Sequence, residues 1–215
     1  SEESAHAPYE QRHNWKDMWI VDPLDGTKEF IKKNGDFTVN IALAENGTPV
    51  LGVIYVPATQ ELYWGLCGSG AGKLTGVDST MRFADMAVIK AASAMLPVVE
   101  HREVFTVVAS RSHLNDETRA YIEQLQATHG HTDTLSRGSS LKLCMVAEGR
   151  ADVYPRFAPT MEWDTAAGHA IASAAGCEVV RADDGTPLTY NKPDLHNPWF
   201  IVRRKKDLQH NANCR

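Results

Sequence analysis

Two aspartates three positions apart, Asp22 and Asp25, form the most informative chemical pattern in this sequence of 215 residues. They follow residues 19–21, an apolar run that is typical of a buried strand. Gly26 and Thr27 come next and are predicted to begin a short helix. A strand end, a turn and a helix start direct carboxylates and free amide N–H groups toward one place. Because divalent cations prefer carboxylates and phosphate groups prefer such amides, the pattern indicates a site for both.

Further acidic residues lie at two other places in the sequence. Glu2 and Glu3 precede the first pair, and Asp164 begins a predicted helix, 164–175, that is rich in alanine and glycine. Small side chains allow that helix to pack closely, so its first turn can approach the site around Asp22. One carboxylate can bridge two cations, and two cations can bind the attacking and leaving oxygens of a phosphate ester. The acidic residues therefore predict a Mg²⁺-dependent phosphatase.

Each of these residues also has a simpler interpretation. Aspartate is a favoured helix N-cap, so Asp22 or Asp25 could cap the helix that follows them, and Asp164 could cap its own helix. Thr27 could likewise be a cap, or its hydroxyl could hold a water molecule and help to deprotonate it. Pro23 between the two aspartates, and the Gly-Thr pair after them, favour the metal site over the cap.

The composition excludes some classes of protein. With 27 acidic and 22 basic residues the net charge is −5, which argues against a protein that coats nucleic acid. No apolar run approaches the roughly 18 residues that indicate a transmembrane segment, and no secretory signal is visible. The four cysteines are widely separated in the sequence, so we expect reduced, buried thiols in a cytoplasmic protein.

The pattern changes along the chain and divides it into two halves and a tail. Residues 1–103 are predicted to form a mainly antiparallel half with the metal site, in which the glycine-rich segment 68–72 is a turn rather than a phosphate loop. Residues 104–202 alternate between predicted strands and helices. Residues 203–215 form a basic tail, expected to be disordered and solvated, with weak contact to an anionic membrane surface as the alternative. The predicted strands are 19–21, 37–43, 50–56, 61–66, 104–109, 151–154, 178–181 and 199–203, and the predicted helices are 27–30, 116–125, 139–148 and 164–175.

Two longer segments carry a family resemblance. Residues 19–32 resemble the first signature of the inositol monophosphatase superfamily, and residues 163–176 are similar to its second. The segments that resemble the bacterial CysQ branch, which comprises 3′(2′),5′-bisphosphate nucleotidases, are 22–30, 110–113, 138–142 and 154–157. The resemblance extends from Ser1 to about Val202.

The resemblance implies an α/β (α+β) fold, the layered αβαβα sandwich of the sugar phosphatases. Members of the family have several dozen residues before the acidic motif, which supply two helices and an aspartate that helps to activate water. This sequence begins inside that motif, at Ser1-Glu2-Glu3, so we expect the N-terminal helices to be missing.

The resemblance also implies roles for individual residues, with Mg²⁺ as the cofactor and two to three ions in the site. The metal ligands would be Glu2, Asp22, the carbonyl of Leu24, Asp25 and Asp164. The catalytic residues would be Thr27, which contacts the nucleophilic water, Asp22 and Glu2. The scissile phosphate of the substrate would contact Gly26 and Thr27, and the substrate would lie beside Leu24, Asp25 and Asp164. Its nucleotide or its other phosphate would contact His113, Ser139, Lys142 and Arg156.

The residues themselves support part of this assignment. A second phosphate needs cationic groups that donate several hydrogen bonds, and Lys142 and Arg156 are such groups. Without the resemblance, each would be interpreted as a solvated surface charge, and His113 as a turn or cap residue.

Three hypotheses about function follow. The first is hydrolysis of adenosine 3′,5′-bisphosphate to AMP and phosphate, in the recycling of a by-product of sulfate assimilation, by an enzyme that the resemblance implies to be sensitive to lithium. The second is hydrolysis of inositol phosphate or another sugar phosphate on the same fold. The third is a truncated chain that binds metal and nucleotide without catalysis. The expected partner is a small nucleotide, and no nucleic acid is expected to bind. The protein is expected in the cytoplasm or peripherally on the cytoplasmic face of the inner membrane. No oligomeric state is predicted.

Overall fold

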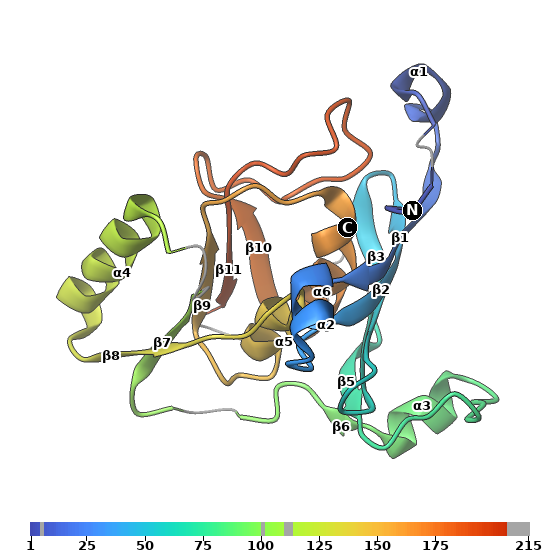
Figure 1. The fold of residues 1–215 in the computed structure, drawn as a ribbon, viewed down its shortest axis with the longest axis horizontal. Helices are drawn as coiled ribbons and strands as arrows, with labels where there is room; N and C mark the ends of the chain where they lie inside the picture. Colours follow the sequence, from blue (N-terminus) through green and yellow to red (C-terminus); the bar gives the residue numbers. More distant parts are fainter. Residues whose placement is uncertain (5–6, 100–101, 110–113, 206–215) are drawn as a thin grey trace.

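The computed structural model describes residues 1–4, 7–99, 102–109 and 114–205, and it arranges them in two β-sheets and several helices (Figure 1). The first sheet has six strands in the order β1-β2-β3-β4-β5-β6, and every neighbouring pair is antiparallel. Its strands are β1 (Asp17–Asp25), β2 (Thr38–Glu45), β3 (Thr48–Val56), β4 (Glu61–Leu66), β5 (Gly70–Leu74) and β6 (Ala94–Met95).

The second sheet has five strands in the order β10-β11-β9-β7-β8. Its strands are β7 (Phe105–Val108), β8 (Thr132–Leu135), β9 (Val153–Arg156), β10 (Cys177–Arg181) and β11 (Phe200–Arg204). β7 pairs in parallel with β8 and β9, whereas the pairs that involve β11 are antiparallel. The helices are α1 (Tyr9–Arg12), α2 (Thr27–Lys32), α3 (Met86–Ala92), α4 (Asp116–His129), α5 (Leu141–Ala147) and α6 (Glu162–Ala174).

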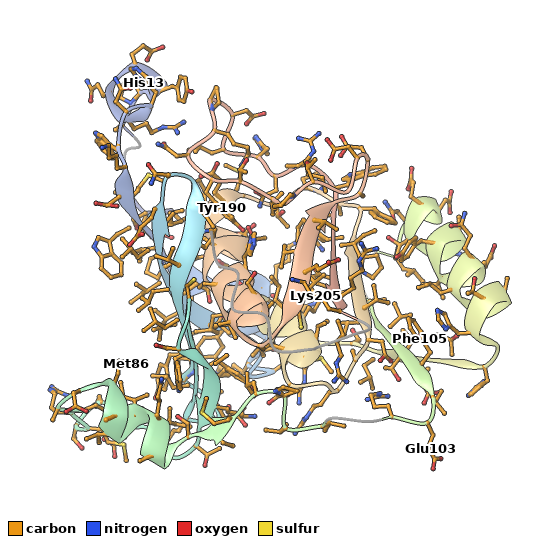
Figure 2. The ribbon with its side chains drawn as sticks, turned by 180° about the vertical axis from the view of Figure 1, so that it is seen from behind. His13, Met86, Glu103, Phe105, Tyr190 and Lys205 are labelled. Atoms are coloured by element: carbon orange, nitrogen blue, oxygen red, sulfur yellow. The ribbon has the colours of Figure 1, made fainter. Side chains whose placement is uncertain are left out.

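Helices and sheets alternate in layers. The adjacent helices α5 and α6 lie between the two sheets, and α4 covers the far side of the second sheet (Figure 1). On the outer face of the first sheet, Met86 and Ile89 of α3 pack against Trp64 and its apolar neighbours (Figure 2). This succession of layers agrees with the predicted fold class.

The position of α6 depends on two glycines of the first sheet. A Cβ atom on Gly52 would overlap the carbonyl oxygen of Ala167, and one on Gly65 would lie 2.5 Å from the Cα atom of Ile171. The prediction that small residues allow α6 to pack closely is therefore confirmed, and the sheet provides small residues as well. Because α6 is fixed in this way, its first turn lies beside the end of β1.

Some local predictions were wrong. The glycine-rich turn is in part strand β5, because Gly70 and Gly72 pair with Leu66 and Trp64 of β4. β8 and α3 were not predicted. Arg204 belongs to β11 rather than to the tail, whereas Arg203, which was included in both the predicted strand and the predicted tail, lies in the strand. Residues 206–215 lie outside the described residues.

The prediction of reduced thiols holds only in part. Cys144 and Cys177 are free and buried, but Cys67 is disulfide-bonded. Among the described residues, no helix combines the length and the apolar character needed to cross a membrane.

Candidate active site

Three aspartates from two separate elements converge on one place. Asp22 and Asp25 lie at the end of β1, where the register with β2 shifts, and Asp164 lies in the first turn of α6. One carboxylate oxygen from each lies within 4.8 Å of the others. The Oδ1 atom of Asp22 accepts a hydrogen bond of 3.0 Å from the amide of Leu24, whereas its Oδ2 atom is buried and has no hydrogen-bond partner among the described residues. A buried carboxylate oxygen without a donor fits a cation, and oxygen ligands suit Mg²⁺.

The electrostatics of the three aspartates also fit a cation. Burial, the charge of Asp25 and the proximity of Glu2 raise the pKa of Asp22 to about 8. Burial raises the pKa of Asp164 to about 6, against the hydrogen bond that its Oδ2 atom accepts from the amide of Met161 at 2.8 Å. Negative charge is therefore unfavourable at this place until a positive charge compensates it.

Gly26 and Met161, rather than the aspartates, are the N-caps of α2 and α6. Gly26, in the left-handed region at φ 90°, is the N-cap of α2, and none of the described side chains caps that helix. The interpretation of Asp22 and Asp25 as caps is therefore wrong. Asp164 is not the N-cap of α6 either, because that position is Met161; Asp164 is the third residue of the helix, its carboxylate accepts a hydrogen bond from the amide of Met161, and it belongs to the acidic cluster.

Glu2, Gly26 and Thr27, which the resemblance also assigned to the site, differ in their exposure to solvent and in their contacts. Glu2 is exposed, its amide donates a 3.1 Å hydrogen bond to the carbonyl of Val21, and its side chain lies close enough to raise the pKa of Asp22. Gly26 lines the cavity described below, while Thr27, the first residue of α2, is exposed to solvent.

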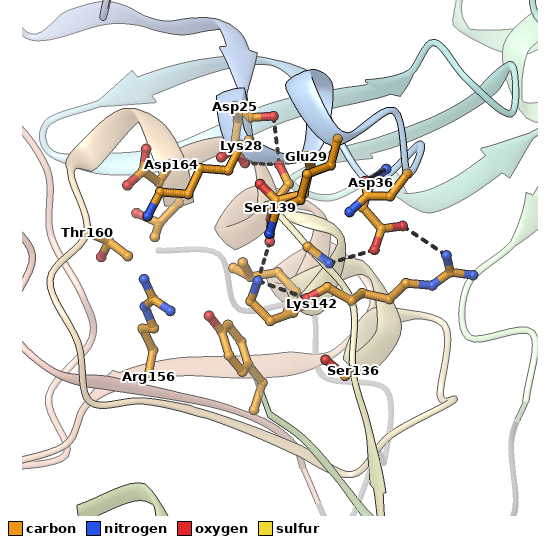
Figure 3. A pocket seen from close by; sticks show the side chains of 18 of the residues that line it. Asp25, Lys28, Glu29, Asp36, Ser136, Ser139, Lys142, Arg156, Thr160 and Asp164 are labelled. Atoms are coloured by element: carbon orange, nitrogen blue, oxygen red, sulfur yellow. Dashed lines mark hydrogen bonds and ion pairs between the residues drawn. The ribbon is translucent and has the colours of Figure 1, made fainter. Parts of the chain in front are cut away.

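A cavity of about 890 Å³ opens beside the acidic cluster. Figure 3 shows that Asp25, Asp164, Ser139, Lys142 and Arg156 all line it. The structure thus brings together residues that lie far apart in the sequence and that the resemblance assigned to one site. His113 lies outside the described residues.

Lys142 is not a surface charge, so that interpretation of it is wrong. Its side chain lies in the cavity wall and is 6% exposed, and its Nζ atom donates to the carbonyl oxygens of Ser139 and Arg137 at 2.9 and 3.2 Å. Burial and the adjacent Arg156 lower the pKa of Lys142 to about 8. An anion in the cavity would stabilise the protonated form.

Arg156 supplies a second cation to the same wall. One of its terminal nitrogens donates to the carbonyl of Pro159 at 3.1 Å, and its Nε atom is buried with no hydrogen-bond partner in the part of the chain that the structure describes. Two cations with unused donors, beside a cluster of three acids, give the cavity one side for a metal ion and another for an anion.

Sequence reasoning missed several polar residues that support the site. Thr38 and Asn40 of β2 are fully buried and bond to Asp25, and the amide of Ser140 donates to the same carboxylate at 2.7 Å. Polar residues at alternate positions of an otherwise apolar strand, on its buried face, were the available signal.

Comparisons with known proteins identify relatives of this chain. The model of the "Inositol monophosphatase family" matches residues 1–212. The chain is 50% identical over 203 residues to the 3′(2′),5′-bisphosphate nucleotidase CysQ of Salmonella typhimurium, a match that covers 94% of this chain and 74% of the relative. The CysQ nucleotidase of Escherichia coli is 46% identical over 195 residues, which are 90% of this chain and 71% of the relative.

A solved structure shows the same fold. The crystal structure of CysQ from Bacteroides thetaiotaomicron, described as a bacterial member of the inositol monophosphatase family, superposes with a TM-score of 0.90 at 55% identity, over 95% of this chain and 76% of that chain. Because the sequence match and the superposition agree over nearly all of the described residues, the chain belongs to the inositol monophosphatase family.

Proposed function

We propose that this chain is a Mg²⁺-dependent phosphatase that converts adenosine 3′,5′-bisphosphate to AMP and phosphate. The observation that carries the proposal is the presence of Lys142 and Arg156 in the cavity that is lined by Asp25 and Asp164, two of the three clustered aspartates. A substrate with two phosphates needs two anion sites, and the cavity has a metal side and a cationic side. The similarity to relatives that are named 3′(2′),5′-bisphosphate nucleotidases supports the same substrate.

The donor set fits the metal that the family implies. Asp22, Asp25 and Asp164, with Glu2 and the carbonyl of Leu24, would hold two to three Mg²⁺ ions. Bound Mg²⁺ makes water more acidic and neutralises charge on phosphate oxygens.

The other residues would bind and orient the substrate. The amides of Gly26 and Thr27, at the start of α2, would bind the scissile phosphate, and the hydroxyl of Thr27 would orient the attacking water. The water oxygen forms the new bond to phosphorus as the bond to the 3′ oxygen of the ribose breaks, and that oxygen leaves with a proton. Ser139, Lys142 and Arg156 would contact the nucleotide and its other phosphate, and we assign His113 to the same task from its sequence motif.

We assign the chain to the recycling of a by-product of sulfate assimilation in the cytoplasm. The proposal includes inhibition of the enzyme by lithium. It also includes weak contact between the basic residues near the end of the sequence and the cytoplasmic face of the inner membrane. Sedimentation with anionic vesicles tests the membrane contact, and a rate measured in lithium chloride against sodium chloride tests the inhibition.

Phosphate release from adenosine 3′,5′-bisphosphate and from inositol 1-phosphate, each over a range of Mg²⁺ concentrations, tests the substrate. We expect a higher kcat/KM for the nucleotide, and equal or reversed values would overturn the proposed substrate. Arg156→Gln should lower kcat/KM for the nucleotide at least tenfold and leave that for inositol 1-phosphate nearly unchanged. Binding of Mg²⁺ and nucleotide without turnover would overturn the catalytic part of the proposal.

A further inference from the structure

The carboxylate of Asp25 is held by polar residues from two elements, the strand β2 and the loop before α5. We infer that Thr38 and Asn40 of β2, with Ser140 of that loop, are positioning residues that fix Asp25 in the orientation in which it binds a metal ion. The inference rests on the metal site of the proposed function and adds residues that do not touch the substrate or the metal themselves.

The hydrogen bonds to Asp25 converge on a single oxygen. Its Oδ2 atom accepts from the amide of Ser140 at 2.7 Å, from Nδ2 of Asn40 at 3.3 Å and from Oγ1 of Thr38 at 3.4 Å, and also from the hydroxyl of Ser139. A carboxylate has two oxygens, so donors concentrated on Oδ2 leave Oδ1 for a cation. The arrangement fixes the rotation of the carboxylate as well as its place.

The hydroxyls around Asp25 also lie within hydrogen-bond distance of one another, and because each has a single proton, the proton of Thr38 is shared among Asp25 and the two serines. The hydroxyl of Thr38 lies 2.8 Å from that of Ser139 and 2.9 Å from that of Ser140, and the Ser140 hydroxyl donates to Oδ1 of Asn40 at 2.9 Å. Thr38, Asn40 and Ser140 are 0, 1 and 2% exposed. Buried hydroxyls and amides that lose a partner are costly, so each residue restricts the orientation of the others.

The register of the first sheet explains why these two strand residues have this role. Thr38 of β2 pairs with Asp25 of β1, and Asn40 pairs with Asp22. Positions 38 and 40 point to the same buried face because side chains alternate along a strand. Two metal-ligand positions on one strand therefore face two polar positions on its neighbour.

The same loop connects this cluster to the cationic side of the cavity. Ser139 has a left-handed backbone at φ 54°, and its carbonyl accepts the 2.9 Å hydrogen bond from Lys142. The residues that orient Asp25 are thus continuous with those that orient Lys142.

Titration of the nucleotide-free chain with Mg²⁺ by calorimetry tests the inference. Thr38→Val keeps the shape of the side chain and removes the hydroxyl, and we expect a roughly tenfold weaker Kd for Mg²⁺, the size of effect seen when the hydrogen-bond partner of a metal ligand is lost. Thr38→Ser keeps the hydroxyl and should bind Mg²⁺ within about twofold of the wild type. Ser140→Ala keeps the amide that bonds to Asp25 and should give an intermediate loss.

Thr106→Val is the matched control, because Thr106 of β7 is also 0% exposed and its hydroxyl bonds to Arg102 and Val104 rather than to the site. It should lower the melting temperature and leave the Kd for Mg²⁺ unchanged. The inference is overturned if Thr38→Val binds Mg²⁺ as the wild type does, if Thr38→Ser is as weak as Thr38→Val, or if Thr106→Val weakens binding equally.

The same measurements separate this inference from the proposed function. A wild-type chain that binds Mg²⁺ but releases no phosphate from the nucleotide would overturn the proposed function alone, and the order of the variants in Mg²⁺ affinity would still support the positioning role. A wild-type chain that binds no Mg²⁺ would overturn both.

Discussion

Gly52 of β3 lies so close to Ala167 of α6 that no side-chain carbon fits between the strand and the helix. Gly65 of β4 stands in the same relation to Ile171. These contacts place the axis of α6 directly on the sheet, and they determine how far Asp164 lies from Asp22 and Asp25. The distance between the three aspartates is therefore set partly by residues that have no functional group.

Gly52→Ala should destabilise the protein and separate the three aspartates. The added methyl group must displace backbone atoms of α6, and overpacking of this kind costs about 1–3 kcal/mol. We expect a lower free energy of unfolding in urea together with a weaker Kd for Mg²⁺. Gly185→Ala is the control: that glycine has a φ of 72° but open space around its Cβ position, so stability should fall by about 1 kcal/mol with unchanged Mg²⁺ binding. Equal Kd values for Gly52→Ala and the wild type would contradict the argument.

The acidic cluster predicts how the stability of the metal-free protein depends on pH. The pKa values of Asp22 and Asp164 are raised to about 8 and about 6, from 3.8. The unfolded chain therefore loses these protons at lower pH than the folded chain, and the contribution of these groups to stability falls as pH rises from about 4 to about 8. Mg²⁺ should reverse this loss, so it should raise the melting temperature more at pH 8 than at pH 5.5. At 100 times its Kd it adds about 2.7 kcal/mol, or several degrees.

Differential scanning fluorimetry with Mg²⁺ and with a chelator measures this difference. Asp22→Asn removes one of the titrating groups and should flatten the pH dependence of the chelated protein. A Mg²⁺-induced shift that is independent of pH would contradict the assignment of the cluster as the metal site.

The sequence allowed the cluster of three aspartates to be predicted because the signals are local. Asp22 and Asp25 lie at a strand end that is visible in the apolar pattern, and Asp164 lies at the start of a helix of small residues. The roles of Thr38 and Asn40 depend instead on how β1 and β2 align, and alternation along one strand does not fix the register with its neighbour. β8 was missed because it is four residues long, and one of its two exposed positions is charged. Strand β5 was missed because its glycines resemble a turn in isolation.

A buried histidine on α6 should make stability fall in acid. His169 is 6% exposed, bonds to the hydroxyl of Tyr190 at 3.1 Å, and burial lowers its pKa from 6.5 to about 4. The unfolded chain takes up this proton near pH 6.5, whereas the folded chain excludes it, so the stability contribution of this group is complete above pH 6.5 and is lost between 6.5 and 4. The difference of about 2.5 pH units corresponds to about 3 kcal/mol.

His169→Gln keeps a polar partner for Tyr190 and removes the titration. Its free energy of unfolding should depend less on pH between 6.5 and 4 than that of the wild type, whatever its value at pH 7. The carboxylates titrate in both proteins, so the difference between the two curves isolates His169. Parallel curves would show that the histidine does not titrate as its burial implies.

Arg12 joins the N-terminal residues to the segment that follows β10. It is 5% exposed, and its guanidinium donates to Oδ1 of Asn191 at 2.7 Å and to the carbonyls of Pro193 and Ala7, both at 3.2 Å. The backbone amide of Asn191 in turn donates a 2.8 Å hydrogen bond to the buried carboxylate of Glu162, which lies in the first turn of α6. The chain segment that carries Glu2 is thus connected through Arg12 to the helix that carries Asp164.

Arg12→Gln should therefore weaken the attachment of the N-terminal residues. Loss of several charged hydrogen bonds at a buried position costs about 2 kcal/mol or more, and we expect faster cleavage by thermolysin before residue 16 together with weaker Mg²⁺ binding. Arg82→Gln is the control, because Arg82 is exposed and, among the described residues, its side chain bonds to the carbonyls of Ser79 and Met81 in its own loop. If the two variants are cleaved at the same rate and bind Mg²⁺ equally, the polar connection from Arg12 to Glu162 does not stabilise the site.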